Sequence, residues 1–250
     1  MYASDDECDA RFGSGGAPWV VVPAAGIGSR MGADVPKQYL KIDEQTILLL
    51  TLSRLFSAFP LASFVVALAE TDCWWSSIQT YLPCAVVSCV GGARRDLTVV
   101  NALKAARDAG AANTDWVMVH DAVRPCVPVA DLHRLWRAAI ASGEAALLGV
   151  PVVDSLRRLS PEQGVTDVVP RADVWRVFTP QLFPLWMLES ALALSVSRSH
   201  TVSDESEAVV AAGYRVNAVR GSEENFKITY PEDLQRAADV IRRQSLSMKT

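Results

Sequence analysis

The order in which strand-like and helix-like segments follow one another constrains the fold of this chain most. Short runs rich in Val, Ile, Leu and Phe alternate with longer segments of helical spacing, from Trp19 to the segment after Pro231. Parallel strands need a crossover between them, and a helix is the usual one. The alternation therefore predicts an α/β fold in which a mostly parallel sheet carries helices on both faces. We expect strands at residues 19–22, 64–68, 85–89, 116–120, 145–150 and 214–219, and helices at 46–59, 72–81, 97–108, 128–141, 183–198, 203–212 and from 231.

The alternation breaks between Pro151 and Pro180. This stretch contains no convincing helix, but residues 155–159 and 165–169 have the pattern of two short strands joined through a turn at 161–164. We interpret the stretch 151–180 as containing a β-arm that projects from the main sheet. The unpaired edges of such an arm are usually covered by a partner chain, so the arm predicts a homodimer.

The composition is that of an ordinary globular protein. The chain has 250 residues, of which 50% are hydrophobic and 21% are charged. We expect a single domain over residues 18–245, preceded by a disordered tail over 1–17 that is rich in Asp, Gly and Ser. The net charge of -4 argues against binding to nucleic acid, and no apolar run is long enough to cross a membrane.

The cysteines carry information about the compartment. The five cysteines are scattered and form no Cys-x-x-Cys pair. An odd, scattered set is typical of reduced thiols, which predicts a cytoplasmic protein. A zinc site is not expected, because none of the three histidines lies at ligand spacing from a cysteine.

The first strand runs straight into a loop of very small residues that also carries two cations. Small residues let backbone N–H groups approach an anionic ligand closely, and Arg and Lys compensate its charge. The alternative is a glycine-rich turn whose cations are merely solvated. The combination favours a polyphosphate-binding loop, in which we expect these residues to act: Ala24, Ala25, Gly26, Gly28, Arg30 and Lys37.

Two better-known phosphate-binding motifs do not match this loop. The Walker motif needs a Lys directly after its last glycine, and none follows Gly32. The dinucleotide motif Gly-x-Gly-x-x-Gly would need a glycine at Met31. The loop instead resembles the nucleotidyltransferase signature, an Ala-Ala-Gly-x-Gly-x-Arg-Met run followed a few residues later by Pro-Lys.

Further candidate residues lie at or near the carboxyl ends of strands, where ligands of open α/β sheets bind. The motif Gly91-Gly-Ala-Arg-Arg95 either offers close-approach backbone at a helix N-terminus or forms a plain turn with exposed arginines. Asp121 either holds Mg²⁺ through one oxygen or caps a local turn. Arg124 either binds phosphate or pairs with Asp121, whereas His120 is expected to be packed rather than catalytic. Local sequence favours a salt bridge for Lys227.

Together these motifs resemble the 2-C-methyl-D-erythritol 4-phosphate cytidylyltransferase family of the non-mevalonate isoprenoid pathway. The resemblance spans about Trp19 to Arg236. It rests on the following motifs: Ala24-Ala-Gly-Ile-Gly-Ser-Arg-Met31, Pro36-Lys-Gln-Tyr39, Gly91-Gly-Ala-Arg-Arg95, Val119-His-Asp-Ala-Val-Arg-Pro125, Thr179-Pro-Gln181, Thr201-Val-Ser-Asp-Glu205 and Asn225-Phe-Lys-Ile-Thr229. Several motifs in the right order are far more specific than any one of them.

The resemblance implies a Rossmann-like nucleotidyltransferase sheet and the transfer of CMP from CTP to methylerythritol phosphate, with Mg²⁺ as the cofactor. It implies catalytic roles for Arg30 and Lys37, and Asp121 as the metal ligand. The expected nucleotide-binding residues are Ala24, Ala25, Gly26, Gly28, Gly92, Ala93, Arg95 and Thr98. The expected substrate-binding residues are Arg124, Arg171, Ser203 and Lys227, with Arg171 reaching over from a neighbouring subunit.

Departures from the family pattern are few. Ala93 stands where relatives often have Asp, which leaves only a backbone contact there. Thr98 and Ser203 stand where Ser and Thr are usual, and both keep a hydroxyl.

Two alternatives remain at this stage. One is a cytidylyltransferase for another polyol phosphate, such as ribitol 5-phosphate. The other is a non-catalytic nucleotide-binding module on the same fold, against which the joint presence of Arg30, Lys37, Asp121 and Lys227 argues.

Overall fold

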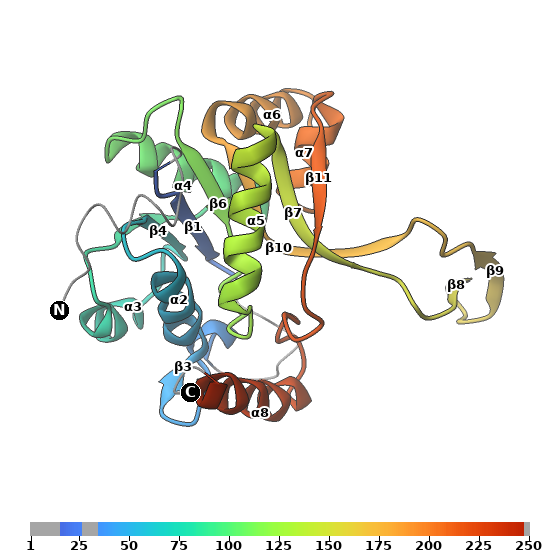
Figure 1. Cartoon of the computed structure of the whole chain (residues 1–250), viewed down its shortest axis with the longest axis horizontal. Helices are drawn as coiled ribbons and strands as arrows, with labels where there is room; N and C mark the ends of the chain where they lie inside the picture. Colours follow the sequence, from blue (N-terminus) through green and yellow to red (C-terminus); the bar gives the residue numbers. More distant parts are fainter. Residues whose placement is uncertain (1–15, 27–34, 248–250) are drawn as a thin grey trace.

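A computed structural model describes residues 16–26 and 35–247 of the chain. A mostly parallel sheet lies at its centre (Figure 1), as the alternation of segments predicted. Within the described residues its seven strands lie in the order β11 (Val216–Arg220), β7 (Ala145–Pro151), β10 (Trp175–Pro184), β6 (Trp116–Val119), β1 (Trp19–Ala24), β4 (Ser63–Leu68) and β5 (Val87–Val90). Strand β10 runs antiparallel to both of its neighbours, and the other pairs are parallel.

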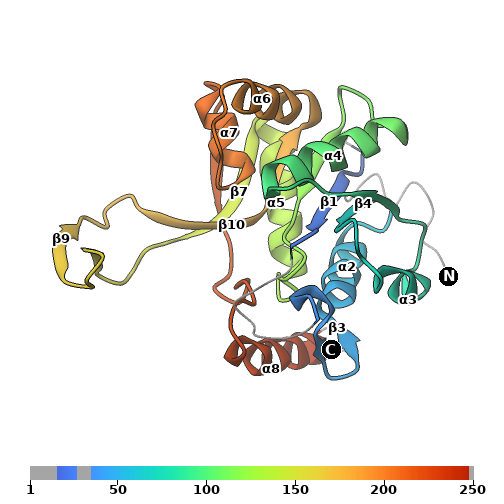
Figure 2. The same cartoon turned by 180° about the vertical axis from the view of Figure 1, so that it is seen from behind.

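Helices cover both faces of this sheet, which confirms the predicted layers (Figures 1 and 2). One face carries α2 (Ile47–Ala58), α3 (Trp75–Ile78) and α5 (Val129–Ser142), and the other carries α4 (Arg95–Asp108), α6 (Leu185–Ser197) and α7 (Glu205–Ala211). Successive residues of a strand point to opposite faces. Thus Val20 and Val22 pack into the first core and Val21 into the second, so the central strand is buried on both sides.

Local signals set most helix ends where the sequence predicted them. The Thr46 side chain accepts a hydrogen bond from Leu49 N at the start of α2, which satisfies an otherwise unpaired donor. Asp72 does the same for Trp75 N before α3. This helix is short, and a 3₁₀ turn, η4 (Gln79–Tyr81), completes the segment. Gly143 ends α5 with a φ of 67°, a conformation that favours glycine.

A third cluster of buried side chains joins the end of the chain to its beginning. Helix α8 (Glu232–Ser247) packs beside a small hairpin of β2 (Lys41–Ile42) and β3 (Gln45–Thr46), which follows the 3₁₀ turn η3 (Lys37–Tyr39). In this cluster Ile228 packs with Val123, and Ile228 N donates to Val123 O at 3.0 Å. This contact brings the segment before α8 against the loop that follows β6. No helix in the described ranges is long and apolar enough to cross a membrane.

The segment between β7 and β10 forms the predicted arm, which extends far from the layered sheet (Figure 1). Its antiparallel strands are β8 (Leu156–Leu159) and β9 (Val165–Val169), close to the two short strands expected there. The expected strands do not include β10, although residues 179–181 have the pattern of a strand end before a helix; a proline is unusual inside a central strand. Here the register shifts between Phe178 and Gln181, around Pro180, and the strand continues past it. Most of the predicted tail, 1–17, lies outside the described residues.

Candidate active site

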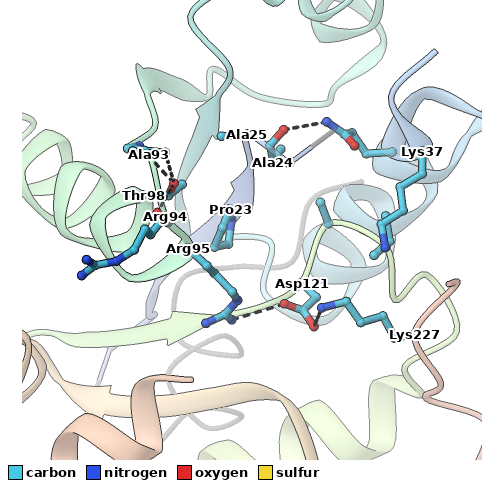
Figure 3. A pocket seen from close by; sticks show the side chains of 15 residues that line it. Pro23, Ala24, Ala25, Lys37, Ala93, Arg94, Arg95, Thr98, Asp121 and Lys227 are labelled. Carbon is cyan, nitrogen blue, oxygen red and sulfur yellow. Dashed lines mark hydrogen bonds and ion pairs between the residues drawn. The ribbon is translucent and has the colours of Figure 1, made fainter. Parts of the chain in front are cut away.

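A cavity of about 360 Å³ opens at the carboxyl edge of the sheet, between the ends of β1, β5 and β6 (Figure 3). Open α/β sheets bind ligands at this edge. The loop that leads into α4 and the segment before α8 complete its wall. It is lined by Pro23, Ala24, Ala25, Gly26, Lys37, Gln38, Gly92, Ala93, Arg94, Arg95, Thr98, Asp121, Ala122, Val123 and Lys227.

One wall of the cavity consists of backbone because two segments approach each other closely. A Cβ atom on Gly91 would lie 2.6 Å from the Cβ of Ala25, and one on Gly92 would lie 2.5 Å from the Cβ of Leu97. Both distances are far inside van der Waals contact, so only glycine fits. The hydroxyl of Thr98 accepts a hydrogen bond from Gly92 N at 3.0 Å and thereby fixes this loop. Of the predicted nucleotide-binding residues in the described chain, all six small or hydroxyl residues line the cavity.

The loop after β1 is only partly described. Gly28 and Arg30, for which we expect nucleotide-binding and catalytic roles, lie outside the described residues. The Pro-Lys-Gln segment beyond it is fixed by a buried hydrogen bond of 2.7 Å from Gln38 Nε2 to Ala24 O. Lys37 lines the cavity, and its ammonium donates to Ile228 O at 3.2 Å. Lys37 therefore reaches the segment that carries Lys227.

Asp121 lies where three basic side chains converge, on the floor of the cavity. Its Oδ1 is 3.2 Å from the guanidinium of Arg95, and its Oδ2 is 3.0 Å from Arg124 Nε and 3.1 Å from Lys227 Nζ. Figure 3 shows Arg95 and Lys227 reaching this carboxylate from opposite sides. Its backbone N–H donates to the hydroxyl of Thr179 at 3.0 Å. Residues from four distant parts of the sequence thus meet at one carboxylate.

The surroundings of Asp121 keep it ionised. Burial alone would raise its pKa, but Lys227, Arg95 and Arg124 more than offset this and lower the pKa well below the usual range of a carboxyl group. The neighbouring His120 is fully buried, and burial lowers its pKa to about 4. Its Nε2 lies 3.1 Å from Arg124 O. His120 is therefore neutral at pH 7 and packed in the interior, as the sequence favoured.

Arg95 links the cavity to a second buried acid. Its guanidinium is 2.6 Å from the Oε1 of Glu205 as well as 3.2 Å from Asp121. Burial by itself lowers the pKa of Arg95, but the two carboxylates outweigh it and the net shift is upward. Arg94, the other arginine of the motif, instead pairs with Asp96 at 2.6 Å and is 42% exposed. Of the two, Arg95 is thus the one fixed inside the site.

Three buried polar residues were not predicted to have a role: Glu205, Thr179 and Asn225. Each lies in a motif that carried the family resemblance, and that is the only signal that could have found them. The amide of Asn225 donates to Thr179 O at 2.8 Å, while Asn225 O accepts from Arg124 at 2.8 Å. Asn225 therefore ties the Lys227 segment to the middle of the sheet.

The structure does not bring two of the predicted substrate-binding residues into the cavity. Arg171 lies in the arm, is exposed, and donates to Val153 O. Ser203 is exposed beside α7, and its hydroxyl donates to Glu207 at 2.7 Å. By contrast, Arg124 and Lys227 both contact Asp121. A single chain thus assembles the nucleotide side of the predicted site and only part of the substrate side.

A divalent cation has one carboxylate available on this floor. The described residues contain no group of three or more His, Cys, Asp or Glu side chains that could hold a metal by themselves. Mg²⁺ does not need such a group, because it is commonly bound by one or two carboxylates together with substrate phosphates and water. Asp121 is ionised, but its two oxygens already contact Arg95, Arg124 and Lys227, so a metal would need most of its ligands from a bound polyphosphate and water.

A mostly parallel sheet with a close-approach backbone loop and converging cations at its carboxyl edge defines an α/β nucleotidyltransferase. The family model IspD, described as 2-C-methyl-D-erythritol 4-phosphate cytidylyltransferase, matches residues 19–243. The chain therefore belongs to the 2-C-methyl-D-erythritol 4-phosphate cytidylyltransferase family.

Individual relatives agree with this assignment. The chain is 41% identical to the 2-C-methyl-D-erythritol 4-phosphate cytidylyltransferase of Hahella chejuensis over 225 residues, which cover 90% of this chain and 93% of that protein. It is 34% identical to the crystal structure of the Francisella tularensis enzyme of the same name, with a TM-score of 0.78 over 90% of this chain and 99% of that one. A crystal structure of a 4-diphosphocytidyl-2C-methyl-D-erythritol synthase gives 31% identity and a TM-score of 0.80.

Proposed function

We propose that the cavity binds CTP and 2-C-methyl-D-erythritol 4-phosphate together and transfers CMP from the first to the second. The observation that carries this proposal is the convergence of Lys37, Arg95 and Lys227 on one cavity that also has a wall of bare backbone. Backbone N–H groups and fixed cations are what two anionic substrates need.

The reaction follows from the charges. A phosphate monoester has its second pKa near 6, so it is mostly dianionic at pH 7 and needs no general base. One of its oxygens attacks the α-phosphorus of CTP; a new P–O bond forms, the bond between the α-phosphorus and the bridging oxygen breaks, and pyrophosphate leaves. The obstacle is repulsion, since two unit charges about 4 Å apart interact by roughly 4 kcal/mol near a protein surface. The buried, neutral His120 is consistent with a site that uses no base.

Each cation has a place in this scheme. Lys37 stabilises charge on the triphosphate as it moves to the leaving group, and Arg95 holds the nucleotide beside the N-terminus of α4. Lys227 and Arg124 hold the phosphate of the acceptor from the side of Asp121. A Mg²⁺ ion shared by Asp121 and the triphosphate would supply further charge neutralisation. Arg30 is assigned a catalytic role with Lys37 on the family motif alone.

The acceptor side is completed, in this proposal, by a second copy of the chain. The arm exposes Val153, Val165 and Val168 at 66%, 65% and 62%, a run of apolar surface that a partner would cover. Arg171 lies on the same arm, outside its own chain's cavity, and would reach the partner's acceptor site. The cysteines Cys73, Cys84, Cys89 and Cys126 are free thiols, which supports a reducing, cytoplasmic location.

The decisive experiment measures pyrophosphate release from CTP with methylerythritol phosphate, with ribitol 5-phosphate, and with neither. We expect rapid release only with methylerythritol phosphate and Mg²⁺, and loss of that release with a chelator. Equal rates with both polyol phosphates would contradict the substrate assignment. Binding of CTP without any release would instead support a nucleotide-binding module.

A further inference from the structure

The buried carboxylate of Glu205 has no role in the scheme above, although it lies close to the site. Its side chain is 1% exposed. Oε1 accepts a hydrogen bond from Arg95 at 2.6 Å, and Oε2 has no partner among the described residues. Burial of a carboxylate is costly unless the group is well paired. A buried acid with one oxygen satisfied is therefore an unfavourable feature that a purely structural role does not explain.

The start of α7 holds Glu205 rigidly. Ser206 N donates to the side chain of Gln181, a residue of β10, at 2.9 Å. Asp204 caps the helix by accepting from Glu207 N at 2.9 Å. These contacts fix the backbone of the first turn of α7, from which Glu205 projects, to the central strand β10.

Arg95 is held between two carboxylates that lie on different elements. Its guanidinium contacts Glu205 of α7 at 2.6 Å and Asp121 of the loop after β6 at 3.2 Å. The shorter contact is the one outside the cavity lining. We infer that Glu205 is a positioning residue, which holds the guanidinium of Arg95 in the cavity wall and limits its contact with Asp121 to one N–H group at 3.2 Å. This inference rests on the proposed function, in which Arg95 binds the nucleotide.

Electrostatics alone would predict that loss of the negative charge of Glu205 strengthens nucleotide binding, but the geometry predicts that it weakens binding. Without the Glu205 charge, Asp121 is the carboxylate of the described residues that still contacts Arg95. A guanidinium prefers to grip both oxygens of a carboxylate with two parallel N–H groups. Arg95 would then turn further toward Asp121, which it already contacts at 3.2 Å, and away from the nucleotide. Removal of a negative charge from an anion-binding cavity should therefore weaken nucleotide binding.

The test compares Glu205→Gln with the parent protein in two assays. Calorimetry measures CTP affinity in the presence of Mg²⁺ and without the acceptor, and steady-state kinetics measure kcat and KM. Loss of a hydrogen bond to a charged group corresponds to a fold-change of about 10–100, and we expect CTP binding to weaken by that factor. The matched control is Glu189→Gln, because Glu189 also pairs with an arginine, Arg107, but at the opposite end of α4 from the cavity. It should leave CTP affinity unchanged.

A double-mutant cycle shows whether Glu205 acts through Arg95. Glu205→Gln should have almost no further effect on CTP affinity once Arg95→Ala is present, because the residue that it positions is gone. Unchanged or tighter CTP binding by Glu205→Gln, in a protein whose thermal unfolding shows that it is folded, would overturn the inference, and so would additive effects in the cycle. Since CTP binding is measured without turnover, failure of the cytidylyltransferase assay would refute the proposed function and leave this comparison intact.

Discussion

The cavity and the β-arm differ in which side chains they bury: charged groups are buried at the cavity, whereas apolar groups are exposed on the arm. At the cavity, Asp121 and the neighbouring Glu205 are almost fully buried; three basic side chains of the same chain contact Asp121, and Arg95 also contacts Glu205. In the arm, Val165 and Val168 are 65% and 62% exposed, and nothing in the described chain covers them. Buried charge is compensated locally, whereas apolar surface on the arm is not compensated at all. One chain can therefore build an electrostatic site by itself, but its arm is suited to another surface.

The largest effect should come from removing the charge at the centre of the cavity. Asp121→Asn leaves Lys227, Arg95 and Arg124 without their shared anion, and breaking a buried ion pair costs about 3–5 kcal/mol. Urea unfolding at pH 7 measures the loss. The control is Asp43→Asn, because that carboxylate is 59% exposed and pairs with the exposed Arg242. A surface pair contributes about 0–1 kcal/mol, so the control should change little.

The same variant has a predicted pH signature. The pKa of Asp121 is depressed in the folded protein, so its contribution is complete above the unfolded pKa of about 3.9 and is lost as the pH falls below that value. The difference in unfolding free energy between the parent and Asp121→Asn should be flat from about pH 7 to 5. It should then shrink by about 1.4 kcal/mol per pH unit below about pH 4. A difference that stays constant down to pH 3 would contradict the ion network.

The next effect is on the rate. Lys37→Ala should lower kcat by about 10²–10³-fold, by analogy with the removal of an oxyanion donor, while CTP still binds. Steady-state kinetics with saturating substrates measure it. Lys41→Ala is the matched control, since Lys41 is an exposed lysine a few residues further on in β2. A near-normal kcat for Lys37→Ala would contradict a catalytic role for Lys37.

A substitution in the arm should have a smaller effect, on the KM for the acceptor instead of on kcat. Arg171→Ala should raise the KM for methylerythritol phosphate by about tenfold with little change in kcat, as loss of one charge-assisted contact implies. Arg158→Ala, at an exposed position of β8, is the control. An unchanged KM would exclude Arg171 from the acceptor site.

Mixed dimers show which subunit Arg171 serves. A dimer of one Arg171→Ala chain and one Lys37→Ala chain contains an intact site only if Arg171 acts across the interface. Co-expressed mixed dimers should then recover activity at low acceptor concentration, relative to either variant alone. No recovery would mean that Arg171 acts within its own chain.

Features that depend on local sequence patterns could be predicted, whereas features that depend on distant residues could not. Strand β1, the starts of helices α2 and α3, and the backbone wall at Gly91 and Gly92 depend on local patterns, and each was predicted near its observed place. Of strand β10 only a strand end at residues 179–181 was expected, and the structure accommodates Pro180 inside the longer strand with a register shift. Local rules also linked Lys227 to a salt bridge but not to its partner.

Long-range pairing is what the sequence could not supply. Arg95 and Glu205 are 110 positions apart, so no local rule joins them. Arg124 was left between a phosphate ligand and a partner of Asp121; the structure of the free chain shows the ion pair. Arg171 and Ser203, which the family resemblance implied for the acceptor, do not line the cavity of their own chain.

The smallest expected effect on stability belongs to the arm and tests the comparison most directly. Val168→Asp places a charge on exposed apolar surface of β9, where surface substitutions usually change the unfolding free energy by less than about 0.5 kcal/mol. The same charge buried in an interface would be unpaired and strongly unfavourable. Light scattering should thus show a shift from dimer to monomer with an unchanged far-ultraviolet spectrum. Leu61→Asp, a leucine 61% exposed outside the arm, should leave the mass as it is. If Val168→Asp kept the parent's mass, the arm would be free surface, and the contrast with the cavity would have to rest on charge alone.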